Sequence, residues 1–246
     1  MSSTVNVSEI FKIDDVTIAY GWRKFVAVES LTLRLEKGGS LALLGLNGAG
    51  KTSTIRLLMG MVRPQIGQVE IFGSRPGELK ALARIGFAPE DATPPEYLKG
   101  EEYLDFVASF RIKGKTARSK AVSEQMQWFE MPSNRRIRDY SKGMRRKLIL
   151  AQALIGDPEM LILDEPLNGL DPLFIMKLRE RVEAYLKNGG SLLLSSHILA
   201  EVEKVCTSVA IIREGKVAYT GSSASAVQQY GSIEKAFAHF VGRSEA

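Results

Sequence analysis

The chain has 246 residues, of which 45% are hydrophobic and 25% are charged, and its net charge is +5. This length suits one α/β domain, residues 1–246, with a sizeable buried core. The longest apolar runs are too short to cross a bilayer, and the first 15 residues lack the apolar core of a signal peptide. The single cysteine, Cys206, cannot form an internal disulfide. These features exclude a membrane-spanning or disulfide-stapled chain and fit a reducing cytosol.

The first predicted elements are two strands over residues 11–20 and 26–35, in which apolar and polar residues alternate with the period of half-exposed strands. They lie on either side of GWRK, so we expect an antiparallel pair at the start of the chain. Tyr20 closes the first of these strands. An aromatic ring there can stack on an adenine base, but an ordinary strand-end tyrosine is the alternative, and the local sequence does not decide between them.

Residues 40–54, SLALLGLNGAGKTST, combine a strand, a glycine-rich loop and the start of a helix. The apolar residues 41–44 are typical of a strand buried in a parallel sheet, and GLNGAGKT fits the phosphate-binding pattern G-x-x-x-x-G-K-[ST] at every defined position. The glycines let consecutive N–H groups point inward around an anion, and the helix N-terminus adds partial positive charge. Lys51 would reach the β- and γ-phosphates, and the Thr52 hydroxyl would bind Mg²⁺. The loop therefore predicts a nucleoside triphosphate site rather than a simple glycine-rich turn.

The middle of the chain is mainly helical. Strands are predicted over residues 68–72 and 85–88, but two helical segments then follow each other with no strand between them. We therefore expect an α-helical subdomain, over about residues 92–157, inserted in the α/β core. Its last helix lies in DYSKGMRRKLILAQALIG, has Ser141 as the expected N-cap, and is apolar on one side and basic on the other.

Two acids follow the next predicted strand. The apolar residues 160–163 of EMLILDEP indicate a buried strand, and Asp164 and Glu165 stand at its carboxyl end, where open α/β sheets bind their ligands. Adjacent carboxylates in such a place are costly unless a cation or a proton transfer uses them. Asp164 is suited to holding Mg²⁺ through water, and Glu165 to orienting and deprotonating an attacking water. An acidic turn without chemistry is the alternative.

The closing third returns to α/β alternation, with a helix over residues 172–187, a strand over 191–195, a hairpin turning at Glu214 and Gly215, and helices over 222–230 and 233–241. His197 follows the predicted strand SLLLSS directly. A lone histidine is usually structural, but one placed after a buried strand can contact a γ-phosphate.

Five motifs occur in order along the chain: GLNGAGKT, YSKGM, LILDEP, NGLD and SSH. Together with Tyr20 they resemble the nucleotide-binding subunit of an ATP-binding cassette (ABC) transporter, and the resemblance extends to His197. YSKGM stands where that family has its LSGGQ signature, with Lys142 and Met144 in place of Gly and Gln, and Glu90 stands where the family has Gln. These departures resemble the subgroup that serves exporter permeases, and they remove no residue needed for hydrolysis.

The resemblance implies a P-loop NTPase core with a mostly parallel sheet, an N-terminal antiparallel β subdomain and an inserted α-helical subdomain. It implies ATP and Mg²⁺ as the bound groups, with Tyr20 stacking on the adenine. The residues that would wrap the phosphates are Asn47, Gly48, Ala49, Gly50, Lys51, Thr52 and Ser53. The residues that would hold the metal or its water are Thr52, Glu90 and Asp164.

The resemblance also implies a head-to-tail dimer with two ATP molecules at its interface. Ser141 and Gly143 would contact the γ-phosphate of ATP bound to the other subunit, and Asp171 would belong to the loop that crosses the interface. Within one chain, Glu165 would be the catalytic base, and Lys51 and His197 would act with it.

Three functions are therefore weighed. The leading hypothesis is an ATPase subunit that works as a dimer, with a homodimer expected from the family pattern. It would drive a separate membrane permease of exporter type from the cytoplasmic face of the cell membrane. A soluble ABC ATPase acting on nucleic acid or ribosomes is the alternative, which the basic segment NRRIRDYSKGMRRK encourages, but such proteins generally carry two cassettes or a long coiled-coil insertion. A small-molecule kinase would leave YSKGM and SSH as coincidences. No direct nucleic-acid partner is expected.

Overall fold

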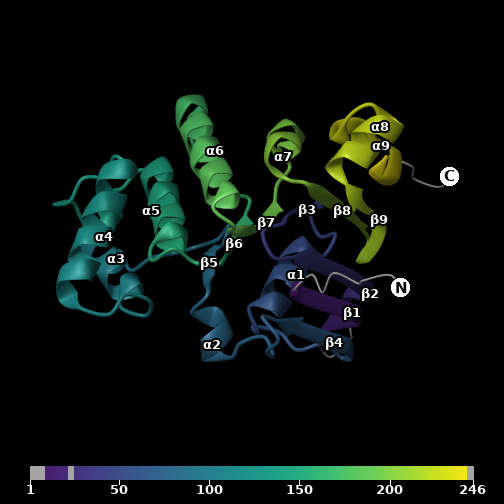
Figure 1. The fold of residues 1–246 in the computed structure, drawn as a ribbon, viewed down its shortest axis with the longest axis horizontal. Coiled ribbons are helices and arrows are strands. Elements are labelled where there is room, and N and C mark those ends of the chain that lie inside the picture. The colour runs from purple at the N-terminus through teal and green to yellow at the C-terminus, as the bar shows by residue number, and fades with distance from the viewer. Residues whose placement is uncertain (1–8, 22–24, 243–246) are drawn as a thin grey trace, which may run out of the picture.

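The chain forms two β-sheets that lie against each other through a helix (Figure 1). The structure is a computed structural model, and it describes residues 9–21 and 25–242. The smaller sheet has three antiparallel strands in the order β2-β1-β4, which are β1 (Glu9–Tyr20), β2 (Phe25–Glu36) and β4 (Ile66–Ile71). The expected antiparallel pair at the start of the chain is confirmed, while most of the GWRK turn, residues 22–24, lies outside the described residues.

The larger sheet has six strands in the order β5-β6-β7-β3-β8-β9. These strands are β3 (Ser40–Leu44), β5 (Ile85–Ala88), β6 (Met160–Asp164), β7 (Ser191–Ser195), β8 (Ser208–Arg213) and β9 (Lys216–Ser222). All of its neighbouring pairs are parallel except β8 and β9. The last pair turns at Glu214 and Gly215, whose φ angles of 50° and 80° are those of a tight two-residue hairpin. The expected hairpin and the mostly parallel sheet are confirmed.

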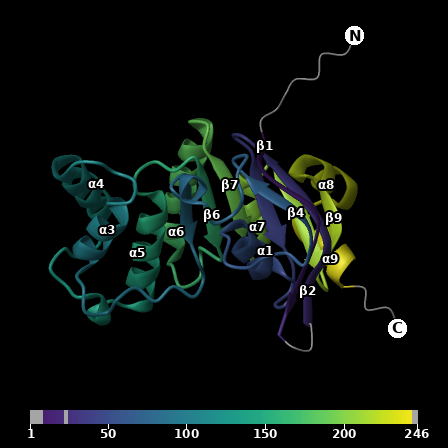
Figure 2. The same cartoon turned by 90° about the horizontal axis from the view of Figure 1, so that it is seen from below.

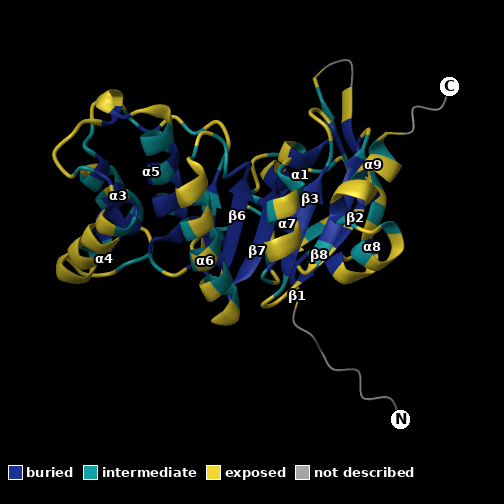
Figure 3. Cartoon of the chain, turned by 90° about the horizontal axis from the view of Figure 1, so that it is seen from above, coloured by how far each residue is buried: buried dark blue, intermediate teal, exposed yellow. Residues whose placement is uncertain are grey.

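The central strands are apolar in their middle residues because each of them faces two cores. In β3, Leu41 and Leu43 belong to the core shared with helix α1 (Lys51–Leu58) and the small sheet, whereas Ala42 and Leu44 belong to the core on the opposite face. Successive strand side chains point to opposite faces, so a strand covered on both sides has no solvent-facing position. These strands are accordingly dark blue in Figure 3.

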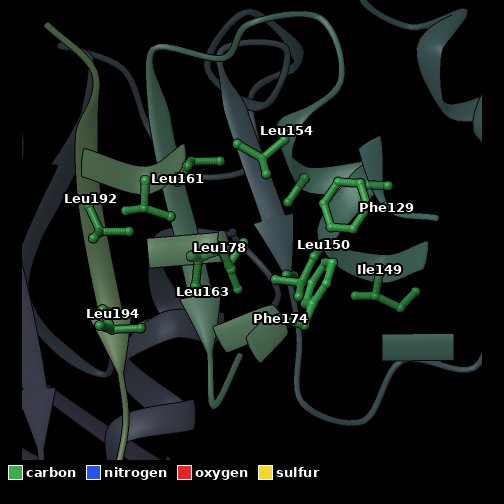
Figure 4. Packing of buried hydrophobic residues seen from close by; sticks show 14 of the residues in the cluster. Phe129, Ile149, Leu150, Leu154, Leu161, Leu163, Phe174, Leu178, Leu192 and Leu194 are labelled. Atoms are coloured by element: carbon green, nitrogen blue, oxygen red, sulfur yellow. The ribbon is translucent and has the colours of Figure 1, made fainter. Parts of the chain in front are cut away.

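Helices cover the second face of the large sheet (Figure 1). The helices of the chain after α1 are α2 (Leu79–Leu82), α3 (Gly100–Ala108), α4 (Lys115–Trp128), α5 (Lys142–Leu154), α6 (Pro172–Lys187), α7 (Leu199–Val205), α8 (Ser223–Tyr230) and α9 (Ile233–Val241). Figure 4 shows Leu161, Leu163, Leu192 and Leu194 of β6 and β7 facing the side chains of α5 and α6. None of the helices within the described ranges is long and apolar enough to span a membrane.

The helices α3, α4 and α5 lie together at one end of the molecule (Figure 2). They form the α-helical subdomain, which follows β5 and precedes β6 in the chain. Ile137–Asp139 forms a short 3₁₀ turn ahead of α5. Helix α5 begins as predicted, with Ser141 as its N-cap, the Ser141 hydroxyl accepting the Met144 N–H at 3.2 Å. The half-buried Arg111 joins this subdomain to the sheet by donating to the backbone oxygens of Ile85 and Ile155.

Candidate nucleotide-binding site

The loop of residues 45–50 connects β3 to α1 at the carboxyl end of the sheet. Its shape requires glycine, since Gly48 and Gly50 have φ angles of 80° and 112°, where side chains are strained. A Cβ atom on Gly50 would also lie 2.7 Å from the backbone oxygen of Ala27 in β2. The small sheet therefore packs against one side of the loop and helps to fix the curvature of the loop backbone.

The β8–β9 turn holds the same loop from another side. The Gly215 N–H donates to the Ala49 backbone oxygen at 3.0 Å, and the Gly215 oxygen accepts the Glu29 N–H at 2.8 Å. A Cβ atom on Gly45 would lie 2.5 Å from the oxygen of Ile212 in β8. The loop is thus fixed by segments that are far from it in the sequence.

A cleft of about 740 Å³ opens above this loop. Many of the residues predicted from the sequence line it together, namely Tyr20, Asn47, Gly48, Gly50, Lys51, Thr52, Ser53, Glu90, Asp164, Glu165 and His197. Phe25, Ala27 and Asn168 also line it, although the sequence analysis did not single them out. Ala49, the one residue of the predicted phosphate-wrapping set that does not line the cleft, is buried.

Lys51 and Thr52 begin helix α1 and face into the cleft. The Lys51 ammonium donates to the backbone oxygens of Gly45 at 2.8 Å and Leu46 at 3.2 Å, and its side chain is almost fully buried. The Thr52 hydroxyl lies 3.4 Å from a carboxylate oxygen of Asp164. The phosphate-loop hydroxyl and the acid at the end of β6 therefore meet, as the sequence predicts for a shared metal.

Asp164 is buried at the end of β6. Burial raises the pKa of its carboxyl group, while hydrogen bonds from Ser195 and Thr52 oppose that increase by favouring the ionised form. A bound cation would stabilise the same ionised form. The site therefore contains a carboxylate whose burial makes it costly to ionise without a positive partner.

Glu165 and His197 are in hydrogen-bond contact in the cleft. The His197 ring Nδ1 lies 2.7 Å from the Glu165 carboxylate, and the His197 backbone N–H lies 3.3 Å from the same oxygen. Glu165 has a φ of 46°, an unusual value for this residue type. Its backbone N–H donates to both the backbone oxygen and the hydroxyl of Ser195, each at 3.1 Å. These contacts explain how a strained backbone persists and aims the carboxylate into the cleft.

Glu90 reaches the cleft from the loop after β5. The Asn168 side-chain amide donates to its carboxylate at 3.2 Å. At the opposite wall, the Tyr20 hydroxyl donates to the Ser53 hydroxyl at 3.3 Å, and Phe25 pairs with Tyr20 across the β1–β2 ladder. Phe25 is 67% exposed, so two aromatic rings border the part of the cleft where the sequence analysis places a base.

Ser141, Gly143 and Asp171 are not among the described residues that line this cleft. Ser141 and Asp171 are exposed and act as N-caps, the latter accepting the Phe174 N–H at 2.9 Å. Gly143 of YSKGM lies close to the NGLD motif, since a Cβ atom on Gly143 would be 3.0 Å from the backbone oxygen of Gly169. One chain therefore brings YSKGM next to NGLD, while Ser141, Gly143 and Asp171 themselves stay outside the cleft above the phosphate loop.

The oxygen donors of Thr52, Glu90 and Asp164 fit Mg²⁺, which prefers carboxylate and hydroxyl oxygens and fills its remaining positions with water and phosphate. Within residues 9–21 and 25–242, no group of three or more His, Cys, Asp or Glu side chains forms a metal cage. A Mg²⁺ ion here would accordingly depend on nucleotide phosphates for some of its ligands, which is the usual arrangement for this ion.

Comparison with known proteins decides the family. The family model described as ABC transporter matches residues 28–168, which is more than half of the chain. The chain belongs to the ABC transporter family. The segment that matches begins in β2 and ends just after the acids of β6, so it contains the phosphate loop, YSKGM and LILDEP.

Curated relatives of this ABC protein agree with that family. An uncharacterized ABC transporter ATP-binding protein of Synechocystis is 34% identical over 225 residues, covering 89% of this chain and 64% of the relative. The Nod factor export ATP-binding protein I of Rhizobium johnstonii is 35% identical over 207 residues, covering 82% of this chain and 65% of the relative. The chain thus spans slightly less than two thirds of the length of these two relatives.

Solved structures match the whole cassette. The ATP-binding subunit of an ABC transporter superposes with a TM-score of 0.86 at 29% identity and covers 94% of this chain and 99% of its own. A dimeric cassette bound to ADP and phosphate superposes with a TM-score of 0.79 over 86% of this chain and 98% of its own, and at 19% identity it supports the fold alone. The predicted P-loop NTPase fold is confirmed, and membership of the ABC family supports ATP binding by this chain. Action on nucleic acid or ribosomes is not favoured.

Proposed function

We propose that this ABC cassette is the ATPase subunit of an exporter and drives a separate membrane permease. The observation that carries the proposal is the single cleft in which the phosphate loop, Asp164, Glu165 and His197 meet. The Rhizobium relative is named for export, and the YSKGM signature with Glu90 has the exporter-like form. Because the permease lies in the membrane, the cassette would bind it from the cytoplasmic side.

ATP would enter the cleft with its base beside Tyr20 and Phe25 and its phosphates on the loop. Aromatic rings give such a base a stacking surface, and the loop N–H groups surround the phosphate oxygens. Lys51 would leave the oxygens of Gly45 and Leu46 and contact the terminal phosphates instead. When bound at Thr52, Mg²⁺ would supply neutralisation of the phosphate charge.

Glu165 would act as the general base for hydrolysis. Its carboxylate points into the cleft and is held by the His197 ring and backbone N–H. A water between Glu165 and the γ-phosphate would transfer its proton to this carboxylate as it attacks. His197 would orient the base and contact the phosphate, while Lys51 would stabilise the charge on the phosphate oxygens.

Two copies of the chain would complete the site. Ser141 and Gly143 lie at an exposed helix start outside the cleft of their own chain. They would therefore contact the γ-phosphate of ATP bound to a second cassette. Asp171, next to them in space through NGLD, would line the same interface. The chain would then be one cassette domain, residues 1–246, with the helical subdomain over about residues 92–157.

The test is a variant that binds ATP but does not hydrolyse it. In Glu165→Gln the amide keeps the size of the side chain but cannot accept the proton, so ATP should persist and hold two chains together. We expect the wild type to be mainly monomeric and Glu165→Gln with Mg-ATP to be mainly dimeric in light scattering after size exclusion. Ser141→Arg and Lys51→Ala, each added to Glu165→Gln, should abolish the dimer.

Two results would contradict this function. Hydrolysis of ATP by Glu165→Gln at the wild-type rate would remove Glu165 as the base. A dimer that forms without ATP, or that persists with Ser141→Arg, would remove the composite site. The permease itself would be tested by isolating the complex from native membranes and identifying the co-purifying membrane protein.

A further inference from the structure

One buried guanidinium lies behind the acidic residues of the cleft. Arg146, in the second turn of α5, is 7% exposed. Its Nε donates to the Pro166 backbone oxygen at 3.1 Å. One Nη donates to the Pro89 backbone oxygen at 2.7 Å and lies 3.5 Å from the Glu90 backbone oxygen. The other Nη donates to the Asp164 backbone oxygen at 2.6 Å. All of these acceptors are main-chain oxygens.

These oxygens belong to the segments that carry the three acids of the cleft. Pro89 and Glu90 form the loop after β5, Asp164 ends β6, and Pro166 follows Glu165 directly. A single planar side chain therefore joins three backbone positions that no regular ladder connects. Arginine suits this role because its five donors diverge in a fixed fork, which a lysine or a glutamine cannot reproduce.

The charge of Arg146 also acts on the cleft. Burial lowers the pKa of its guanidinium, and the nearby carboxylates of Asp164, Glu90 and Glu165 oppose that decrease, so the group stays protonated at neutral pH. Among the described residues, however, no carboxylate lies within 4.0 Å of its nitrogens. The direct contacts of Arg146 are therefore to backbone, and its attraction to the acids acts over a longer range.

We propose that Arg146 is a positioning residue of the nucleotide site, which fixes the main chain of Glu90, Asp164 and Glu165 so that their carboxylates converge on metal-bound ATP. The proposal rests on the proposed function of the cleft and adds to it a residue outside the cleft lining. Arg146 touches neither ATP nor metal and acts through the three acids.

Positioning and charge predict opposite results for metal binding. Removing a nearby positive charge by itself leaves the acids more negative and should strengthen the binding of Mg²⁺. Removing the hydrogen bonds of Arg146 lets the acids move apart and should weaken the binding of Mg²⁺. Loss of a contact that holds metal ligands in place typically costs about 10- to 100-fold in metal affinity. The sign of the change therefore separates the two roles.

The experiment measures equilibrium binding of a non-hydrolysable ATP analogue to the full chain by calorimetry, in EDTA and in Mg²⁺. We expect Arg146→Met to weaken binding in Mg²⁺ by about 10-fold or more and to leave binding in EDTA unchanged, because Lys51 and the loop are untouched. Arg146→Lys keeps the charge but not the fork, so it should lose affinity in the same direction.

Arg111→Met is the matched control. Arg111 is a half-buried arginine that, like the buried Arg146, donates to backbone oxygens. Its acceptors are those of Ile85, Gln152 and Ile155, away from the acids. We expect it to lower the melting temperature without changing the ratio of the affinities in Mg²⁺ and EDTA. If Arg146→Met does not fold, Arg146→Lys gives the same comparison.

Three results are distinguishable. Tighter binding of the analogue in Mg²⁺ by Arg146→Met would replace positioning with a charge role. Equal losses in Mg²⁺ and EDTA, as from general unfolding, would also overturn the proposal. A wild-type chain whose binding gains nothing from Mg²⁺ would instead overturn the proposed function, because the acids would then not serve a metal.

Discussion

The turn between β8 and β9 should stabilise the phosphate loop, and Gly215→Ala tests this. The Gly215 backbone bonds both Ala49 of the loop and Glu29 of β2. A Cβ atom on Gly215 would lie 3.0 Å from the Ala27 oxygen and 3.2 Å from the Val28 Cα. Both are backbone atoms that cannot rotate away, so the turn must move from the loop and weaken both hydrogen bonds.

The expected loss of stability has two sources. Gly215 has a φ of 80°, and a left-handed conformation costs an alanine about 1 to 2 kcal/mol. Two weakened hydrogen bonds add about 0.5 to 1.5 kcal/mol each when fully lost. We therefore expect Gly215→Ala to lower the free energy of unfolding by about 2 to 4 kcal/mol, and to weaken ATP binding because the Ala49 peptide is no longer held.

Gly189→Ala is the control, because Gly189 has a φ of 87° but a Cβ atom there meets nothing within 4 Å. It should cost only the left-handed strain and leave ATP binding unchanged. Urea unfolding gives the free energies, and equilibrium titration gives the ATP affinity. The reasoning is refuted if the two variants lose equal stability and both bind ATP like the wild type.

Two further predictions concern the surface and the core. Residues 94–102, between the site and the helical subdomain, should receive a cytoplasmic helix of the permease. Glu96→Lys should therefore reduce transport in vesicles that hold the complex and leave the basal rate of ATP hydrolysis unchanged. Unchanged transport across variants of this segment would place the contact that couples ATPase to permease elsewhere. Burial raises the pKa of Cys206 to about 12, so from about pH 9 upward the unfolded thiol ionises while the folded one keeps its proton. Relative to Cys206→Ala, stability should then fall by up to about 1.4 kcal/mol per pH unit in urea unfolding, and an equal difference at pH 8 and pH 10 would contradict this.

Much of the cleft was predictable because its residues stand at strand ends. The apolar runs of β3, β6 and β7 identify strands buried on both faces, and parallel strands bring their carboxyl ends to one edge. Lys51 and His197 come after β3 and β7, and Asp164 ends β6, so their meeting required only the sheet order. Ser141 was likewise predictable, since an N-cap depends on the residues directly after it.

Other residues depended on contacts that local patterns do not contain. Arg146 stands in the basic run RRK of a helix that was expected to be basic on one side, yet it is buried because three distant carbonyl groups surround it. Phe25 and Asn168 reach the cleft only through strand pairing and loop folding. Helix α7 was missed, since its seven residues provide less than two full turns of periodic pattern.

The place of β3 in the sheet has a consequence for protein synthesis. β3 lies between β7 and β8, so the strand that begins the phosphate loop is translated long before either of its neighbours. A nascent chain that has emerged only as far as residue 190 contains GLNGAGKT and LILDEP but has no partner for either edge of β3. Pairing between distant segments is slow and leaves apolar surface exposed meanwhile. The ribosome therefore releases the binding motifs early, and β3 gains its two neighbours only after residues 191–213 have emerged.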